Sequence, residues 1–216
     1  MADDGSHDLK RKILILFAHP AQRRSEVNVA LAKAASSLKF VTLVDLYSEY
    51  PDYFIDVDRE QKRLLKHDII VFLHPVYWYS TPAMLKEWQD LVLEYGFAYG
   101  ANGTKLVGKT LFCALTAGGP QEAYHKRGYN HFTLRELFAP LEQTANLCGM
   151  TWLPPFALYA SRRAHEEGRV EAHAAEFTEL LTALSEDRIS LLAASRRDLL
   201  NGVPMKPVRT PGKVAR

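Results

Sequence analysis

The chain has 216 residues, 47% of them hydrophobic and 24% charged, which suits one globular domain with a sizeable core. Its formal net charge of +2 is too small to indicate nucleic-acid binding, and no HExxH motif occurs, so we expect no metal site. Cys113 and Cys148 lack CxxC spacing, which favours a reducing compartment. The acidic N-terminus is not a signal peptide, and no apolar run reaches the ~20 residues of a membrane span. We therefore expect a cytoplasmic protein, peripheral at most on the cytoplasmic face of the inner membrane.

Short apolar runs alternate with helical patterns along the chain. The patterns predict strands over 12–18, 40–46, 68–74, 110–116 and 150–159, and helices over 25–38, 59–66, 83–95, 133–147 and 167–185. Strands that alternate with helices indicate βαβ units around a parallel sheet. We expect an α/β fold with a flavodoxin-like, doubly wound, five-stranded parallel sheet, order 2-1-3-4-5, and helices on both faces.

The domain boundaries follow from where this alternation starts and stops. We expect a disordered lead over 1–11, the flavodoxin-like domain over 12–188, and a loosely ordered basic tail over 189–216. The basic residues of the tail are Arg196, Arg197, Lys206, Arg209, Lys213 and Arg216. Such a tail fits either a solvated end or a contact with anionic lipid or an acidic partner.

Three aromatic residues in a row, Tyr77, Trp78 and Tyr79, follow Val76 directly after the third predicted strand. A strand-to-helix turn lies at the carboxyl end of a strand, where open α/β sheets bind their ligands. Pro75 and Pro82 bracket the turn and stiffen it. The rings fit a core cluster beneath the sheet edge, or the wall of a pocket for a flat ligand.

The loop after the first strand enters a helix and contains His19. Ser25 is a good N-cap residue, and the free amides of a first helical turn, here Glu26 to Asn28, suit a phosphate. The loop has no glycine, which excludes the GxGxxG and GxxxxGK phosphate loops. Alone, this loop also fits an ordinary capped helix with a histidine in its turn.

The loop after the fourth strand reads Thr116, Ala117, Gly118, Gly119. Paired glycines allow a ligand to approach the backbone closely, although alone they also fit a plain turn. Three such loops at one sheet edge together predict a site for a planar ring with a phosphate tail. The expected cofactor is FMN, with the flavin half of FAD as the alternative.

The chain resembles the flavodoxin-like NAD(P)H:quinone oxidoreductases, and most closely the ancillary subunits of glutathione-regulated potassium efflux systems. The matching segments are ILILFAHPAQRRSEVN, LYSEYPDYFIDVDREQ, DIIVFLHPVYWYSTPAMLKEWQDLVLEYGFAYG, LTAGGP and CGMTWLPPFALY, which span most of residues 12–160. The Tyr-Pro-Asp segment at 50–52 points to the potassium-system branch.

The resemblance implies roles for the residues of the three loops. His19 and Ser25, Glu26, Val27 and Asn28 would hold the phosphate and ribityl chain, and Val76 to Tyr79 with Thr116 to Gly119 would hold the isoalloxazine. Tyr124 and His131 would be the catalytic residues that stabilise charge, although Asn130 stands at the strict histidine position. Ala117 replaces the second threonine of the usual Thr-Thr-Gly-Gly loop.

The implied function is NAD(P)H:quinone oxidoreduction, with two-electron hydride transfer through FMN in a ping-pong cycle. NAD(P)H would be the co-substrate, and the protein would be a homodimer with contacts through helix 83–95 and residues 95–103. The alternative is a regulatory subunit that activates a potassium/proton antiporter with little or no turnover. A flavodoxin-type electron carrier is disfavoured, because those proteins are strongly acidic and this chain is not.

Overall fold

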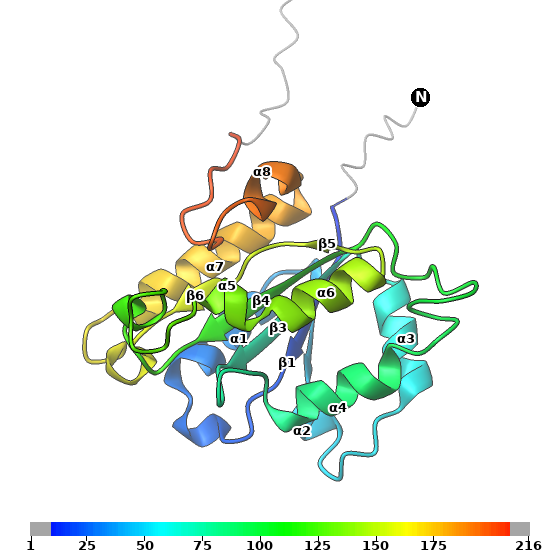
Figure 1. Ribbon diagram of the computed structural model, residues 1–216, viewed down its shortest axis with the longest axis horizontal. Helices are drawn as coiled ribbons and strands as arrows, with labels where there is room; N and C mark the ends of the chain where they lie inside the picture. Colours follow the sequence, from blue (N-terminus) through cyan, green and yellow to red (C-terminus); the bar gives the residue numbers. More distant parts are fainter. Residues whose placement is uncertain (1–9, 208–216) are drawn as a thin grey trace, which may run out of the picture.

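A parallel β-sheet forms the centre of this computed structural model, which describes residues 10–207 (Figure 1). Its strands are β1 (Ile13–Phe17), β2 (Val41–Asp45), β3 (Ile69–Pro75), β4 (Thr110–Thr116), β5 (Thr151–Trp152) and β6 (Phe156–Leu158). The order is β2-β1-β3-β4-β5, with β6 also paired to β4 and every pairing parallel. The predicted fold class and strand order are confirmed.

The last predicted strand, 150–159, is two short strands rather than one. Pro154 and Pro155 separate β5 from β6, and proline has no N–H to give to the ladder. One extra residue lies on this side between the pairs Leu111↔Trp152 and Ala114↔Phe156. The edge of the sheet is therefore bent just before the chain leaves β6.

Two layers of helices cover the sheet. One face carries α1 (Glu26–Ser36), α7 (Val170–Ser185) and α8 (Leu191–Ser195); the other carries α2 (Leu46–Glu49), α3 (Val57–Leu65), α4 (Ala83–Val92), α5 (Leu134–Leu137) and α6 (Ala139–Leu147) (Figure 1). Side chains alternate along a strand, so Ile13 and Ile15 of β1 pack into the first layer, and Leu14 and Leu16 into the second. Both faces of the central strands are buried, as the continuous apolar runs predict.

Several helix bounds differ from the expected ones for local reasons. The helix expected over 59–66 begins at Val57, because the Asp56 side chain caps it by accepting from the Arg59 amide. The helix expected over 133–147 breaks at Phe138 into α5 and α6, and the first piece starts with a Thr133–Glu136 capping box. The helix expected over 83–95 ends at Val92.

The described part of the expected tail is folded rather than loose. Residues 189–207 include α8, and Leu200 and Val203 are buried in the same core as α7. The reason is the burial of these apolar side chains, which the high Arg, Gly and Pro content of the segment did not suggest. Residues 208–216 of the expected tail and 1–9 of the expected lead lie outside the described residues, whereas Arg11 of that lead donates its amide to the Ser185 carbonyl. Within residues 10–207, no helix is long and apolar enough to cross a membrane.

Two 3-10 turns near the carboxyl edge of the sheet, η2 (Gln121–Ala123) and η3 (Ser161–Arg163), follow β4 and β6. A third, η1 (Gln22–Arg24), lies between β1 and α1.

Candidate flavin site

The loops that follow β1, β3 and β4 meet at one edge of the sheet and line a cavity of about 610 Å³, which we call the three-loop cavity. It brings together many of the residues that the sequence suggested: His19, Ser25, Glu26, Val27, Asn28, Val76, Tyr77, Thr116 and Gly118. Its lining does not include Trp78, Tyr79, Ala117, Gly119, Tyr124 or His131. The convergence follows from topology, because parallel strands end at the same edge.

The N-terminus of α1 opens into this cavity with unused polar atoms. Ser25 stands at the N-cap position, but its side chain makes no capping bond, and its buried Oγ has no hydrogen-bond partner within residues 10–207. Asn28 donates from Nδ2 to the Thr116 hydroxyl at 2.7 Å, while its buried Oδ1 also lacks a partner. Buried polar groups are normally hydrogen-bonded, so these two orphan atoms point to a bound polar ligand. The free amides of the first turn give the same place a preference for an anion.

His19 is buried at the entrance of α1 and faces the aromatic turn. Its Nδ1 accepts a hydrogen bond from the Ala21 amide at 3.1 Å, and its ring lies edge-on to Tyr77 with 6.0 Å between centroids. Burial lowers the pKa of His19 below its usual 6.5. The neutral ring therefore carries its proton on Nε2, which is free to donate to a ligand.

The aromatic turn is a strained β-turn. Tyr77 and Ser80 exchange backbone hydrogen bonds of 3.1 and 3.0 Å, and both residues between them have positive φ, 48° at Trp78 and 63° at Tyr79. Positive φ is unusual for bulky L-residues and is typical of functional sites. The central amides of the turn have no acceptor within residues 10–207. Only Tyr77 turns its ring to the cavity, since Trp78 is 94% exposed and Tyr79 donates from its hydroxyl to Asn130 Oδ1 at 3.2 Å.

The paired glycines hold the third side of the site. A Cβ on Gly119 would lie 2.8 Å from the Tyr129 hydroxyl and 3.3 Å from the Tyr124 ring, so a side chain there displaces these tyrosines. The Ala117 side chain is buried, and its amide donates to the Leu158 carbonyl. The amide of Gly118 has no acceptor within residues 10–207, whereas the Gly119 backbone faces the Tyr124 phenol. Gly118 therefore adds one free donor beside the cavity.

The two suggested catalytic residues are not placed alike. Tyr124 packs against Gly119 and the Tyr159 ring, 5.4 Å away between centroids, and burial raises the pKa of its phenol. His131 is exposed, with φ 59°, and does not reach the three-loop cavity. Asn130, by contrast, faces the Tyr124 side chain as well as Tyr79. The structure thus places Asn130, and not His131, beside the tyrosines.

A fourth loop, which the sequence reasoning missed, completes the cavity. Ser161 and Arg162 of η3 line it, and Arg162 Nε is 3.8 Å from where a Gly118 Cβ would stand. Ala160 makes the bend before η3 with φ 48° and donates its amide to the Gly119 carbonyl at 2.8 Å. Arg162 forms no ion pair within residues 10–207, whereas its neighbour Arg163 pairs with Glu167 at 3.5 Å. The available signal was the Ser-Arg-Arg run directly after the last strand.

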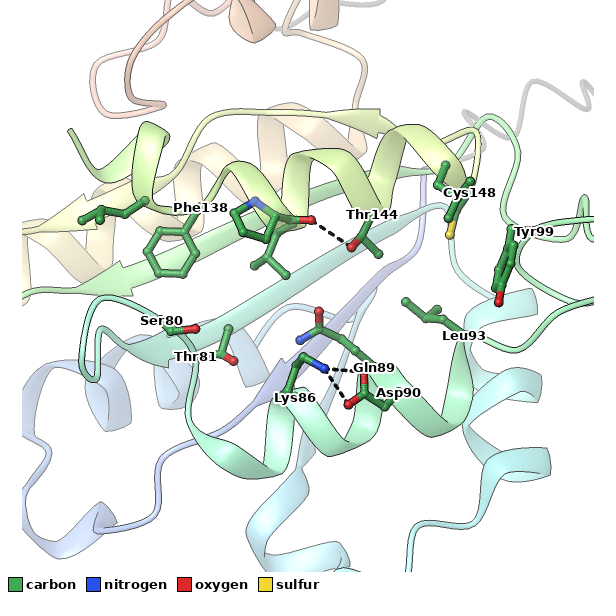
Figure 2. Close-up of a pocket in the computed structure, with 14 residues that line it drawn as sticks. Ser80, Thr81, Lys86, Gln89, Asp90, Leu93, Tyr99, Phe138, Thr144 and Cys148 are labelled. Atoms are coloured by element: carbon green, nitrogen blue, oxygen red, sulfur yellow. Dashed lines mark hydrogen bonds and ion pairs between the residues drawn. The ribbon is translucent and has the colours of Figure 1, made fainter. Parts of the chain in front are cut away.

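A second hollow lies away from the expected site, between α4 and α6 (Figure 2). This α4–α6 groove has a volume of about 350 Å³ and carries the Lys86–Asp90 ion pair, with Nζ–Oδ1 2.5 Å, on its α4 side. Leu147 and Cys148 lie at its α6 end. None of the residues proposed for the flavin lines this groove. Among the described residues, no group of three or more His, Cys, Asp or Glu side chains is placed to hold a metal ion.

Comparison with known proteins agrees with the fold. A family model described as a flavodoxin-like fold matches residues 11–181, and the chain belongs to that family. The glutathione-regulated potassium-efflux system ancillary protein KefG of Serratia proteamaculans (strain 568) is 45% identical over 170 residues, 79% of this chain and 92% of that protein. The resemblance read from the sequence motifs is confirmed.

Solved structures of the same fold carry different names. The general stress protein 14 of Treponema denticola in complex with FMN is 37% identical, covers 80% of this chain and 99% of its own, and has a TM-score of 0.76. An NADPH-quinone reductase of P. pentosaceus is 29% identical, covering 79% and 98%, with a TM-score of 0.70. A structure named as the thermophilic tryptophan halogenase of Streptomycin violaceusniger is 46% identical, covering 77% and 96%, with a TM-score of 0.75. The names disagree on the reaction, so the fold does not select it.

Proposed function

We propose that the three-loop cavity binds FMN and that the protein is an NAD(P)H:quinone oxidoreductase. The observation that carries the proposal is the pair of orphan buried atoms, Ser25 Oγ and Asn28 Oδ1, at a helix N-terminus inside a cavity of about 610 Å³. A phosphate and a ribityl chain supply the acceptors and hydroxyl donors that these atoms and the free α1 amides lack. The FMN complex of the Treponema denticola protein supports FMN over FAD.

The residues of the chain have separate tasks in this proposal. Ser25 and the first-turn amides of α1 bind the phosphate, and the neutral His19 donates from Nε2 toward the same end. Asn28, held by Thr116, orients the chain that joins phosphate to ring. The amides of Trp78, Tyr79 and Gly118, which have no acceptor within residues 10–207, stabilise negative charge on the polar edge of the ring.

A bound flavin supplies hydride acceptance from NAD(P)H and two-electron donation to a quinone. Around it, the Tyr77 ring, which lies edge-on to His19, excludes water from the cavity wall. Arg162, free of carboxylates, attracts the negatively charged co-substrate to the cavity. The name of the P. pentosaceus relative supports the quinone and nicotinamide assignment.

The direct test is the absorption spectrum of the purified protein, followed by turnover. We expect a flavin spectrum, either as isolated or after reconstitution with FMN, and oxidation of NADH or NADPH that depends on added quinone. A protein that binds neither FMN nor FAD at micromolar concentration contradicts the proposal. Flavin binding without turnover contradicts the proposed enzymatic activity but supports the proposed flavin site.

A second function is favoured by the relatives at 45% identity, whose name makes them ancillary to a potassium-efflux system. In this alternative the protein binds the cytoplasmic face of a potassium/proton antiporter and activates it, and flavin serves structure or redox sensing. Potassium efflux from cells that express the antiporter is the test. Efflux that needs the protein, and that persists in a variant without quinone turnover, supports regulation over catalysis.

A further inference from the structure

A separate cavity of about 410 Å³ lies beside Tyr124, and none of its lining residues lines the three-loop cavity. Its walls come from η2, the start of α5, the end of β6 and the C-terminal segment. The residues that decide its chemistry are Glu122, Tyr124, Arg135, Tyr159, Asp198 and Leu199. We call it the C-terminal cavity. The function proposed above does not use it.

The wall that carries Asp198 lies beyond the matched family model, which ends at residue 181. Hydrogen bonds fix this wall to the bent edge of the sheet: the Leu200 amide donates to the Pro155 carbonyl, and the Ala157 amide to Asn201 Oδ1, both at 2.9 Å. Arg135 of α5 donates from Nη1 to the Ser195 carbonyl at 2.8 Å and to the Arg197 carbonyl. The cavity is therefore a built feature of this chain and not a gap beside a loose end.

The wall of the cavity carries two carboxylates and one guanidinium. Glu122 and Asp198 form no ion pair within residues 10–207. The guanidinium of Arg135 donates to the two carbonyls and forms an ion pair with Glu142, with 3.3 Å between Nη2 and Oε1. Arg197, next to Asp198 in the chain, keeps its positive charge but is not part of the lining, and its guanidinium is held by the carbonyls of its own segment. His125, also in the lining, accepts at Nδ1 from the Arg127 amide.

Two phenol rings complete the cavity. Tyr124 and Tyr159 lie 5.4 Å apart between centroids, tilted by 49°. Burial raises the pKa of Tyr159 to about 12, and Tyr124 and Asp198 add to the shift, so the phenol stays neutral. Aromatic faces beside carboxylates are the combination that recognises organic cations, through cation–π and charge attraction together.

We propose that the C-terminal cavity binds an organic cation, a nitrogen compound whose charge faces Asp198 and Glu122 and whose apolar body packs on the Tyr124–Tyr159 pair. The site does not depend on a flavin, so its failure and the failure of the proposed function are separate results. Because Tyr124 also packs against Gly119, such a ligand lies next to the loop of the three-loop cavity.

The test uses three small probes of similar shape: 1-methylquinolinium, neutral quinoline and the anion of quinoline-2-carboxylic acid. Each is titrated into the ¹⁵N-labelled full chain at neutral pH, and amide shifts are followed by NMR. The cation should move amides of residues 121–125 and 198–199, quinoline should bind several-fold more weakly, and the anion should not bind. Shifts confined to another part of the chain, or equal affinities for the three probes, overturn the proposal.

Variants separate charge from shape. Asp198→Asn should weaken the cation roughly three- to five-fold, in line with a partly exposed ion pair, and leave quinoline unchanged. Glu122→Gln is an independent second variant with the same expectation. Asp58→Asn, an exposed carboxylate on α3, is the matched control and should change neither affinity. Undiminished binding of the cation in both carboxylate variants overturns the proposal.

Discussion

Asn28 of α1 donates a hydrogen bond of 2.7 Å to the Thr116 hydroxyl at the end of β4, and so joins two loops that lie 88 residues apart in the chain. The bond fixes which way the amide points, and it leaves the buried Oδ1 without a partner among the described residues, on a side chain that lines the three-loop cavity. A residue held in this way is pre-organised for a ligand, since the ordering of its side chain precedes binding.

Asn28→Ala should therefore weaken FMN about tenfold or more, the expected effect of losing one hydrogen bond and its orientation. Titration of flavin-free protein with FMN, read by quenching of flavin fluorescence, measures the change. Ser36→Ala, an exposed position at the end of the same helix, is the control and should bind FMN as the wild type does. Equal loss in both variants would attribute the effect to the helix rather than to Asn28.

The buried His74 should make the protein less stable in acid. Its ring is fully buried on β3, Nε2 has no partner, and burial lowers its pKa from 6.5 to about 4. As pH falls below 6.5 the unfolded chain takes up a proton that the folded chain does not, so stability present above pH 6.5 is lost down to pH 4. At pH 5.5 the loss from this residue is about 1 kcal/mol.

Urea unfolding of the wild type and of His74→Gln, each at pH 7.5 and 5.5, isolates this contribution. The variant should lose about 1 kcal/mol less than the wild type between the two pH values, whatever its stability at pH 7.5. His173, stacked on Phe156 at 4.3 Å with a pKa near 4, offers an independent repeat through His173→Gln. Parallel pH dependence in wild type and variants would contradict the burial argument.

The strand order and the three converging loops were predictable because they depend on local patterns. Apolar runs in β1, β3 and β4 mark buried parallel strands, and topology then places the segments after them together. The orientation of single side chains was not predictable in this way. Trp78, at the centre of a turn with positive φ, is 94% exposed. A run of three adjacent aromatic residues does not predict that backbone geometry.

Arg162 and the C-terminal wall were missed for a different reason. Both depend on the bend at Pro154 and Pro155 and on the positive φ of Ala160, which together bring η3 to the cavity. The polar composition after residue 189 indicated a solvated tail, but Leu200 and Val203 are buried in contact with residues distant in sequence. Hydrophobic periodicity predicts which face of a helix or strand is buried, but it does not predict which distant segments of the chain pack against each other.

Homodimer formation should use the α4–α6 groove. Leu147, 60% exposed, lines it; Tyr95, 66% exposed, packs on Tyr99 of the lining, and Val107, 60% exposed, lies beside Gly149, next to Cys148 of the lining. Apolar surface gathered around a groove favours burial against a second copy. Leu147→Lys should shift sedimentation equilibrium from dimer to monomer at micromolar concentration. Leu192→Lys on α8, where the leucine is 66% exposed, should not. A monomeric wild type contradicts the prediction.

Glu60 should be the most costly carboxylate to neutralise in the described part of the chain. It is fully buried and accepts from the Tyr50 hydroxyl at 2.7 Å and from Trp88 Nε1 at 3.0 Å, and it pairs with Arg63. These contacts join the Tyr-Pro-Asp segment to α3 and α4. Removing one partner of a buried charge pair costs about 3 kcal/mol, so Glu60→Gln should lower the free energy of unfolding by about that amount.

The matched control is Asp90→Asn, which breaks the exposed Lys86–Asp90 pair on the outside of α4. An exposed pair contributes less than about 1 kcal/mol, because water and salt screen it. Urea unfolding at neutral pH compares the two variants. Glutamine keeps the shape of the side chain but offers one acceptor oxygen to the donors of Tyr50, Arg63 and Trp88, so the loss in Glu60→Gln combines the charge with at least one lost hydrogen bond. Similar, small losses in both variants would mean that Arg63 finds its compensation in Glu49, 3.1 Å away, and that the buried charge of Glu60 is dispensable.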